Sequence, residues 1–425
     1  MSVDHRDPTS RGGLRANTSD RRVVVTGIGV VAPNGIGKTA FWRASVEGIC
    51  SIGPIRRFDA SGHGCRVAGQ VEDLSAADFV GNKVLKQTDR STHMALACCR
   101  MATEDAALAL DREDPTEIGM YFASVFGGMD FAEPELHAQT YLGPGRVSAY
   151  QSIAWFYAAT QGQWSIAAGI RGFGKSIVGD RAGGLQAVLL AALAIRRGHC
   201  AAAYAGGSEA PLVPYTFWIH ESTGMLSTRN DAPERAYRPF DADRSGLVLG
   251  EGSGVLLLED HEHALARGAH IYAEVAGGSM LGGGGAPPTL TARCIAEAVR
   301  DANIEPAQVG LVLAEGLALR EADHREACAI SSALGGDGRA PAVSVPKAAI
   351  GHTLAAAGAI DAIWAALMLH ERVLLPTPGA ETPDCGAPVD LLVGAPQEAS
   401  VDTILCLASG FSGVNAALIM KRYEP

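Results

Sequence analysis

Residues 176–198 read Ser-Ile-Val-Gly-Asp-Arg-Ala-Gly-Gly-Leu-Gln-Ala-Val-Leu-Leu-Ala-Ala-Leu-Ala-Ile-Arg-Arg-Gly. A short apolar run ends at Gly179, and Asp180 then offers a carboxylate that can cap the N-terminus of a helix. The residues that follow are apolar on nearly every side until a basic last turn and Gly198 end the pattern. The stretch therefore predicts a strand, a sharp turn and a buried helix.

The first turn of this predicted helix has two unusual features. Gly183 and Gly184 lower helix propensity, so we expect another backbone or a ligand to pass very close to them. Arg181 stands where many enzymes place a nucleophile, because a helix N-terminus favours developing negative charge. A guanidinium stays protonated and has no lone pair with which to act as a nucleophile. The setting is that of a catalytic site, but the nucleophile is missing.

Composition places the chain among globular proteins with a large core. Of its 425 residues, 47% are hydrophobic and 19% are charged, and no Pro/Ser/Gly-rich linker divides them, so we expect one compact double domain. The formal net charge is −11 and no basic stripe occurs, which argues against nucleic acid or an anionic membrane as a partner. Apolar runs such as 187–195 are far shorter than the roughly 20 residues that span a bilayer.

Cysteine usage points to a reducing compartment. The nine cysteines form no Cys-x-x-Cys pair, and apolar settings such as Ala97-Cys-Cys-Arg100 favour buried free thiols, so we expect a cytoplasmic protein. The first twenty residues are polar and predict a disordered tail rather than a signal peptide or an anchor. A lone Gly27-x-Gly29 is too weak to predict a nucleotide site, and no group has zinc-ligand spacing, so we expect neither a cofactor nor a metal.

Strand and helix patterns repeat along the chain. Residues 21–35 have the pattern of a buried strand that breaks into a glycine turn, and a similar plan begins again near residue 270. A second buried helix is expected at 351–369, followed by two strands around the turn Gly410-Phe-Ser-Gly413. Alternating strands and helices favour an α/β protein with a mostly parallel sheet and helices on both faces.

Three stretches carry a family resemblance. They are Val147-Ser-Ala-Tyr-Gln-Ser-Ile-Ala-Trp-Phe-Tyr-Ala-Ala-Thr-Gln-Gly-Gln163, Ala182-Gly-Gly-Leu185, and the segment 235–254 with its Arg-Pro-Phe-Asp and Gly-Glu-Gly runs. Across about residues 21–422 the chain resembles the β-ketoacyl synthases of the thiolase superfamily, and within them the chain-length factors (ketosynthase β subunits) of type II polyketide synthases. The charged residues of 235–254 are expected to hold a rigid loop.

The resemblance implies a fold and a division of the chain. The fold is an α/β thiolase fold with duplicated βαβαβ halves in a layered αβαβα architecture. The halves are expected at residues 21–265 and 266–425, preceded by the disordered tail at 1–20.

The resemblance also implies which positions correspond to a catalytic site. An active ketosynthase needs a cysteine thiolate and two histidines, and the matching positions hold Arg181, Glu315 and His352, the last with Lys347. Chain-length factors usually carry glutamine at the first position and mostly lack the second histidine, so Arg181 and His352 both depart from that pattern. An anionic Glu315 would repel an enolate, so we assign no catalytic residue and expect no condensation by this chain alone. We interpret His352 as a core histidine whose ring nitrogens are both hydrogen-bonded.

A predicted strand at 121–128 leads into the residues implied to control chain length. In chain-length factors the positions of Met129, Ala132 and Leu136 point across the dimer interface into the partner's acyl tunnel, and offsets of three and four residues share one helical face. Pro134 is tolerable in the first turn of the helix that we expect there. Without the resemblance, the three would be ordinary core or interface residues.

Two functions follow from the resemblance. The first is a non-catalytic subunit that forms a heterodimer with an active ketosynthase α subunit and sets polyketide length by shaping the tunnel, while acyl carrier protein carries the chain. The alternative is an enzyme that decarboxylates malonyl-acyl carrier protein to make starter units, supported by His352 and Lys347. The enzyme would need an open pocket at Arg181, whereas the subunit predicts a filled one.

The replacements at the site predict a specific contact. A buried guanidinium requires an acidic partner, so we expect Arg181 to meet Glu315 through two parallel hydrogen bonds, with Asp180 as the rival partner. Such a pair would fill the pocket and tie the two halves of the chain together.

Overall fold

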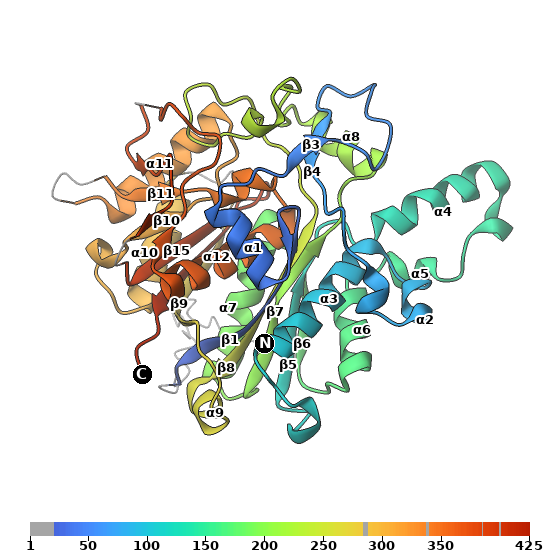
Figure 1. Ribbon diagram of the computed structural model, residues 1–425, viewed down its shortest axis with the longest axis horizontal. Helices are drawn as coiled ribbons and strands as arrows, with labels where there is room; N and C mark the ends of the chain where they lie inside the picture. Colours follow the sequence, from blue (N-terminus) through green and yellow to red (C-terminus); the bar gives the residue numbers. More distant parts are fainter. Residues whose placement is uncertain (1–20, 284–287, 337–339, 385, 399–400) are drawn as a thin grey trace, which may run out of the picture.

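The computed structural model describes residues 21–283, 288–336, 340–384, 386–398 and 401–425. The tail predicted at 1–20 lies outside the described residues. Within the described part, most elements of the first half of the chain lie on one side of the molecule and most elements of the second half lie on the other (Figure 1).

The long strands of each half follow the same order in space. In the first half the order is β1 (Val23–Ala32), β8 (Gly252–Asp260), β7 (Ala202–Glu209), β5 (Ile118–Ala123) and β6 (Gly174–Ile177). In the second half it is β9 (Ala273–Gly282), β16 (Val414–Arg422), β15 (Thr403–Ser409), β10 (Leu311–Leu313) and β11 (Ala342–Ser344). In both halves the first two pairings are antiparallel and the last two are parallel. Because the two halves share this order, we propose that the chain divides near residue 266.

Five layers build the molecule. Two helices, α7 (Gly183–Arg196) and α12 (Ala357–Glu371), lie between the two sets of strands and pack against each other. Helix α3 (Arg90–Asp105) covers the outer face of the first set, and α10 (Pro288–Asp301) covers that of the second. The stretch Leu354–Glu371 is long and apolar enough to cross a membrane, yet 89% of it is buried inside the protein, so core packing accounts for its composition.

Shorter elements complete the structure. The short strands are β2 (Gly35–Ile36), β3 (Ile52–Pro54), β4 (Val67–Gly69), β12 (Val373–Leu374), β13 (Asp390–Leu391) and β14 (Gln397–Glu398). The other helices are α1 (Lys38–Val46), α2 (Asn82–Leu85), α4 (Met129–Leu142), α5 (Gln151–Ala154), α6 (Ala159–Ala168), α8 (Pro214–Ser222), α9 (His261–Ala266) and α11 (Arg320–Leu334).

Glycines let the two central helices touch. A Cβ atom on Gly184 would lie 2.5 Å from the carbonyl oxygen of Ala355, and one on Gly358 would lie 2.8 Å from the backbone nitrogen of Leu185. Neither position has room for a side chain. The close backbone approach predicted from Gly183 and Gly184 is therefore confirmed, and the partner is the segment that leads into α12.

The structure corrects three local predictions. The sheet is mixed rather than mostly parallel, because β8 and β16 each pair antiparallel with both of their neighbours. Helix α4 begins at Met129, so Pro134 lies in its second turn and not in its first. Helix α7 is preceded by a 3₁₀ turn, Asp180–Ala182, and Asp180 does not cap it.

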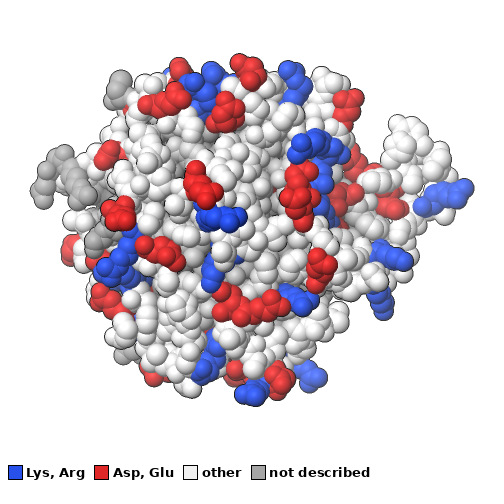
Figure 2. Space-filling view, in the orientation of Figure 1, with Lys and Arg blue, Asp and Glu red and all other residues white. Residues whose placement is uncertain are grey.

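One part of the chain projects from the layered body (Figure 1). We call residues 129–156 the arm; it contains α4, α5 and the segment between them. Tyr141, Leu142, Trp155 and Phe156 are exposed on it, with Tyr141 at 72%. On the face shown in Figure 2, charges of both signs are scattered over the body without an extended basic patch.

Candidate functional site

Arg181 lies in the 3₁₀ turn between β6 and α7, and only 3% of its surface is exposed. The preceding Asp180 adopts a left-handed backbone conformation, with φ of 53°. Its carboxylate accepts the backbone N–H of Phe411 instead of capping α7. The N-cap expected at Asp180 is therefore wrong, because the carboxylate ties the turn to the Gly410–Gly413 loop of the second half.

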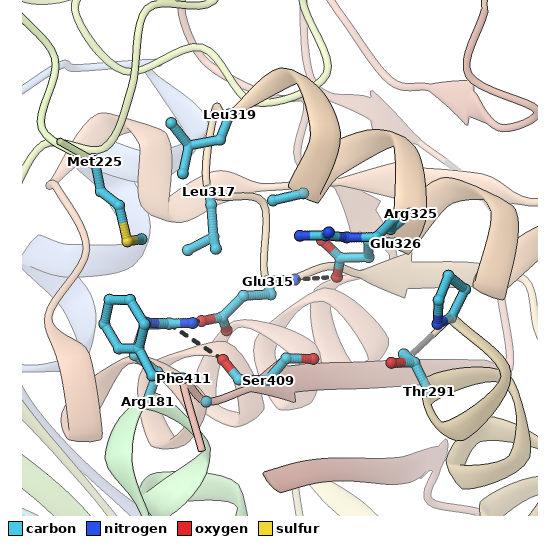
Figure 3. Close-up of a pocket in the computed structure, with 13 residues that line it drawn as sticks. Arg181, Met225, Thr291, Glu315, Leu317, Leu319, Arg325, Glu326, Ser409 and Phe411 are labelled. Atoms are coloured by element: carbon cyan, nitrogen blue, oxygen red, sulfur yellow. Dashed lines mark hydrogen bonds and ion pairs between the residues drawn. The ribbon is translucent and has the colours of Figure 1, made fainter. Parts of the chain in front are cut away.

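The Arg181 guanidinium is held from three directions. Its Nε donates to Glu315 Oε1 at 2.8 Å and to the carbonyl oxygen of Ser409 at 3.1 Å. Its central carbon lies 4.3 Å from the centre of the Phe411 ring, within the range of a cation–π contact. Figure 3 shows Arg181 between Phe411 and Glu315.

The ion pair predicted between Arg181 and Glu315 is confirmed, with a difference in geometry. Arg181 belongs to the first half of the chain, whereas Glu315 follows β10 and belongs to the second, so the pair ties the halves. The expected double hydrogen bond does not form: Arg181 Nη1 and Glu315 Oε2 have no hydrogen-bond partner among the described residues. One reason is that Glu315 Oε1 is shared with His352.

His352 is fully buried and both of its ring nitrogens are engaged. Nε2 lies 3.1 Å from Glu315 Oε1, and Nδ1 accepts the backbone N–H of Leu354 at 3.1 Å. A ring that accepts at Nδ1 carries its proton on Nε2 and donates it to Glu315. Burial lowers the pKa of His352 and the nearby cations Lys347 and Arg181 lower it further, although Glu315 opposes the shift. The side chain is a neutral donor in the core.

Glu315 is the anion at the centre of the site. Burial alone would raise its pKa, but His352, Arg181 and Lys347 outweigh that effect and lower the pKa to about 2. The carboxylate therefore stays ionised at neutral pH. A fixed negative charge at this position disfavours the build-up of a second negative charge, such as that of an enolate, beside it.

Lys347 shapes the loop that carries Glu315. Its Nζ donates to the carbonyl oxygen of Ala314 at 2.7 Å and lies 2.6 Å from Asp361 Oδ2 on α12. Burial opposes its charge, but Asp361 and Glu315 raise its pKa on balance. Lys347 is thus bound to a carboxylate and a backbone oxygen.

Two further carboxyl groups support the site, and the sequence analysis missed both. Asp361 is the ion-pair partner of Lys347; its place as the lone charge in the apolar stretch 351–369 was a signal for it. Glu326 accepts the backbone N–H groups of Glu315 and Gly316, at 2.7 and 3.0 Å, and burial raises its pKa to about 8. No sequence pattern marked Glu326.

A half-open hollow of about 280 Å³ lies beside the ion pair (Figure 3). Arg181, Glu315 and Phe411 form part of its wall, and Leu317, Leu319 and Arg325 lie on the side of the second half. The guanidinium fills the position where a nucleophile would stand, and the hollow lies next to it. No group of three or more His, Cys, Asp or Glu side chains in the described ranges could hold a metal ion.

The residues implied to control chain length lie on α4, apart from the ion pair. Met129 and Ala132 are buried, while Leu136 is half-exposed on the arm. None of the three lines the hollow at Arg181. The charged segment 235–254 is also separate from the hollow. Arg238 pairs with Asp241 at 3.6 Å, and Arg244 pairs with Asp323 at 3.5 Å and with Asp384 at 2.8 Å, so its charged residues do hold the loop.

Comparison with known proteins decides the family. The model of the β-ketoacyl synthase N-terminal domain matches residues 20–264, and that of the β-ketoacyl synthase C-terminal domain matches residues 272–381. The chain belongs to the β-ketoacyl synthase family. The layered fold with its large central sheet is accordingly the thiolase-like ketosynthase fold.

Relatives within the family include both polyketide and other synthases. The chain is 38% identical to the actinorhodin polyketide putative β-ketoacyl synthase 2 of Streptomyces coelicolor, and 39% identical to the tetracenomycin polyketide synthase ketoacyl synthase β subunit of Streptomyces glaucescens. These alignments cover 95% and 94% of this chain and 99% and 98% of the relatives. It is also 36% identical to 3-oxoacyl-[acyl-carrier-protein] synthase 2 of a Synechocystis strain, over 96% of this chain and 100% of that one.

Solved structures of the same family are similar throughout. The ishigamide ketosynthase/chain length factor matches with a TM-score of 0.89 and 29% identity, over 95% of this chain and 100% of that one. A type II PKS acyl-carrier protein in complex with its ketosynthase, bound to the hexaketide, matches with a TM-score of 0.87 and 31% identity over the same shares. The structural neighbours of this ketosynthase-like chain thus include a ketosynthase/chain length factor and a ketosynthase–carrier protein complex.

Proposed function

We propose that this β-ketoacyl synthase family member is a non-condensing ketosynthase β subunit that pairs with an active ketosynthase and sets polyketide chain length. The observation that carries the proposal is the buried Arg181–Glu315 ion pair, at 2.8 Å, in place of a nucleophile and its histidine. A relative named as a ketoacyl synthase β subunit is 39% identical, and one named 3-oxoacyl-[acyl-carrier-protein] synthase 2 is 36% identical, so overall similarity separates the two only weakly. The residues at this site therefore carry the distinction.

Condensation needs groups that this site lacks. A thiolate must hold the acyl chain, and neutral or cationic donors must stabilise the enolate that forms on decarboxylation. Arg181 offers no nucleophile, and the ionised Glu315 stands where a donor is required. The residues that replace the nucleophile and the donor are the two partners of one ion pair. Restoring a cysteine at 181 would therefore leave the Glu315 carboxylate in place.

An open strand edge and exposed apolar side chains favour a protein partner for the chain. Strand β6 ends the sheet among the described strands, and its outer edge leaves backbone hydrogen-bonding groups available for another strand. Phe173 and Val178 flank it, and both are exposed. Together with the apolar side chains of the arm, this edge has the character of an obligate protein interface.

The alternative, decarboxylation of malonyl-acyl carrier protein, has less support. It needs His352 and Lys347 free to stabilise an enolate, but His352 Nε2 is engaged by Glu315 and Lys347 by Ala314 and Asp361. The hollow beside Arg181 is the observation in its favour, because a small acyl group could enter it. The filled nucleophile position and the fixed anion favour the subunit.

Reconstitution tests the proposal directly. The chain is co-expressed with a cysteine-bearing ketosynthase α subunit, and polyketide formation from malonyl-acyl carrier protein is measured for the chain alone, the α subunit alone and the pair. We expect product from the pair only. A second pair, in which the α subunit's catalytic cysteine is replaced by alanine, should be inactive, and condensation by that pair or by the isolated chain would refute the proposal.

A further inference from the structure

Three buried carboxyl groups lie beneath the first turn of α4, outside the site described above. Asp89 precedes α3, Asp130 is the second residue of α4, and Glu209 is the last residue of β7. Asp89 and Glu209 are 2% exposed or less, and Asp130 is half-buried as a residue with one oxygen sealed from solvent. We call them the carboxyl cluster.

The carboxyl cluster supports the segment that leads into α4 along its whole length. Glu209 Oε1 accepts the backbone N–H of Val125, at the start of that segment. Asp89 lies against Gly128: a Cβ atom on this glycine would be 2.7 Å from Asp89 Cβ. Asp130 Oδ2 accepts the backbone N–H of Arg90 at 3.0 Å and so binds the first turn of α4 to α3.

The segment that leads into α4 is also tightly packed on the side that faces the arm. A Cβ atom on Gly127 would lie 2.7 Å from the carbonyl oxygen of Trp155, and one on Gly128 would lie 2.1 Å from that of Ala154. Gly127 also has a positive φ of 60°. Because the backbone is wedged between the arm and the carboxyl cluster, a change in the cluster must move the first turn of α4.

The charge of Arg90 lowers the pKa of Asp130 and so acts against burial, but its guanidinium is bound elsewhere. On α3, the Arg90 side chain turns to Glu251, with Nε 2.8 Å from Oε2, and His93 is kept neutral because burial, and next Arg90, lower its pKa to about 4. On α4, Glu133 accepts the backbone N–H of Tyr215. Glu251 is in turn paired with Arg57 as well as Arg90.

Burial disfavours the charged form of all three carboxyl groups, although Asp89 also accepts the backbone N–H and the hydroxyl of Thr92, at 2.9 and 2.6 Å, which favour its charged form. Burial raises the pKa of Asp89 to about 7, with Asp130 as the next cause, and burial raises that of Glu209 to about 8. Burial also raises the pKa of Asp130. Asp130 Oδ1 and Glu209 Oε2 have no hydrogen-bond partner in the part of the chain that the structure describes, so ionisation would leave one oxygen of each carboxylate without a hydrogen bond.

We propose that Asp89, Asp130 and Glu209 are positioning residues for chain-length control: they fix the first turn of α4, and with it Met129 and Ala132, at one depth in the acyl tunnel. The inference rests on the proposed function, because it assigns the tunnel wall to α4. When the carboxyl cluster gains negative charge, like charges repel beneath the turn and the two flanking side chains shift. Product length then depends on pH through this subunit.

The test uses the reconstituted pair with its carrier protein. Product masses are measured between about pH 6 and about pH 9, on either side of the two raised pKa values. For the wild-type pair we expect the length distribution to shift as the pH rises. Asp130→Asn and Glu209→Gln keep the shape of the side chain but each removes one of the charges that would repel, so we expect a smaller shift in these pairs than in the wild type. Glu135→Gln is the matched control, since its carboxylate accepts the backbone N–H of Ser148 on the same arm, outside the cluster; it should shift like the wild type.

A second measurement does not depend on any variant folding. Hydrogen exchange of the backbone amides of residues 124–132 is followed in the wild-type pair, and protection is corrected for the intrinsic pH dependence of exchange. We expect protection of this segment to fall as the pH rises, while that of α7 stays constant. A flat length distribution for the wild type, a variant that shifts like the wild type, or unchanged protection of 124–132 would each overturn the inference.

The outcomes separate the inference from the proposed function. If the chain does not assemble with a ketosynthase, or if enlarging Ala132 leaves product length unchanged, the proposed function fails. If Ala132→Phe shortens the product but the carboxyl cluster variants retain the wild-type pH response, only the inference fails.

Discussion

Arg181 brings a positive charge into a nearly closed interior, and Glu315 is the carboxylate that offsets it. Their side chains are 4% and 2% exposed. Taking two charges out of water is costly, so a buried pair adds little stability as a whole, but removing one partner leaves the other charge uncompensated. The structural value of the pair is therefore best measured by breaking it on one side.

Replacing Glu315 should destabilise the protein far more than replacing a surface carboxylate. We expect Glu315→Ala to cost about 3–5 kcal/mol, because the Arg181 guanidinium would stay buried without a counterion. Glu104→Ala is the control: Glu104 pairs with Arg100 at 2.9 Å on the surface, and such pairs contribute about 0.3–0.5 kcal/mol. Urea unfolding of the assembled protein gives the change in unfolding free energy for each variant. Equal changes would show that the buried ion pair matters no more for stability than the surface pair.

Acid should weaken the contribution of Glu315 in a defined range. Its pKa is lowered from 4.5 to about 2 by folding, so its stabilising effect is fully present above pH 4.5 and is lost as the pH falls toward 2. The difference in unfolding free energy between the wild type and Glu315→Gln should therefore shrink over that range. The check is a series of urea titrations; a difference that stays constant down to the lowest pH would contradict the assigned charge state.

At the scale of elements, the contact between α7 and α12 depends on glycines that leave no room for a methyl group. In a helix interior, Gly→Ala usually stabilises by about 0.4–1 kcal/mol. At Gly184 the new Cβ would lie 2.5 Å from the carbonyl oxygen of Ala355, which is backbone and cannot turn away. The two central helices would have to separate.

We therefore expect Gly184→Ala to destabilise the protein by roughly 1–3 kcal/mol, the usual range for overpacking. Gly162→Ala on α6 is the matched change, because nothing lies within 4 Å of a Cβ there. That variant should be as stable as the wild type or more stable. Thermal unfolding compares the two, and equal melting temperatures would mean that α7 and α12 can part without loss.

The sequence predicted individual helices and strands better than the way in which they pair and contact one another. The buried helix after Asp180, the two strands around the Gly410–Gly413 turn and the glycine contact all followed from local patterns, because burial and the room beside the backbone depend on the residue at each position. The direction of β8 and β16 did not, since a fully buried strand has the same composition whether its neighbour is parallel or antiparallel. The carboxylate of Asp180 was assigned to the nearest helix, yet it binds Phe411, 231 positions away.

The candidate site was likewise predicted only in part. Arg181, Glu315, Lys347 and His352 were placed together by resemblance, and the structure brings them into contact. Glu326 and the carboxyl cluster were not foreseen, because their roles depend on which backbone N–H groups the fold places beside them. Long-range contacts of this kind leave no period or spacing in the sequence.

At the scale of the whole molecule, the proposed function assigns the open edge of β6 and the exposed apolar side chains of the arm to an interface with a partner. Interfaces of obligate partners bury more than about 2,000 Å² and resemble a protein core, so the isolated chain should aggregate or pair with itself. Size-exclusion chromatography of the chain expressed alone and with a ketosynthase α subunit checks this. A stable, soluble monomer obtained without a partner would argue against an obligate heterodimer.

The central claim is that this subunit decides where chain growth stops, and product mass tests it most directly. One ketosynthase α subunit is paired with the wild-type chain or with Ala132→Phe, Met129→Trp or Leu136→Trp, and each pair is first shown to be assembled and active. If α4 lines the acyl tunnel as proposed, added volume there leaves less room for the growing chain, so we predict that at least Ala132→Phe, at a fully buried position, gives shorter polyketides. Identical product masses from all four assembled pairs would contradict the claim.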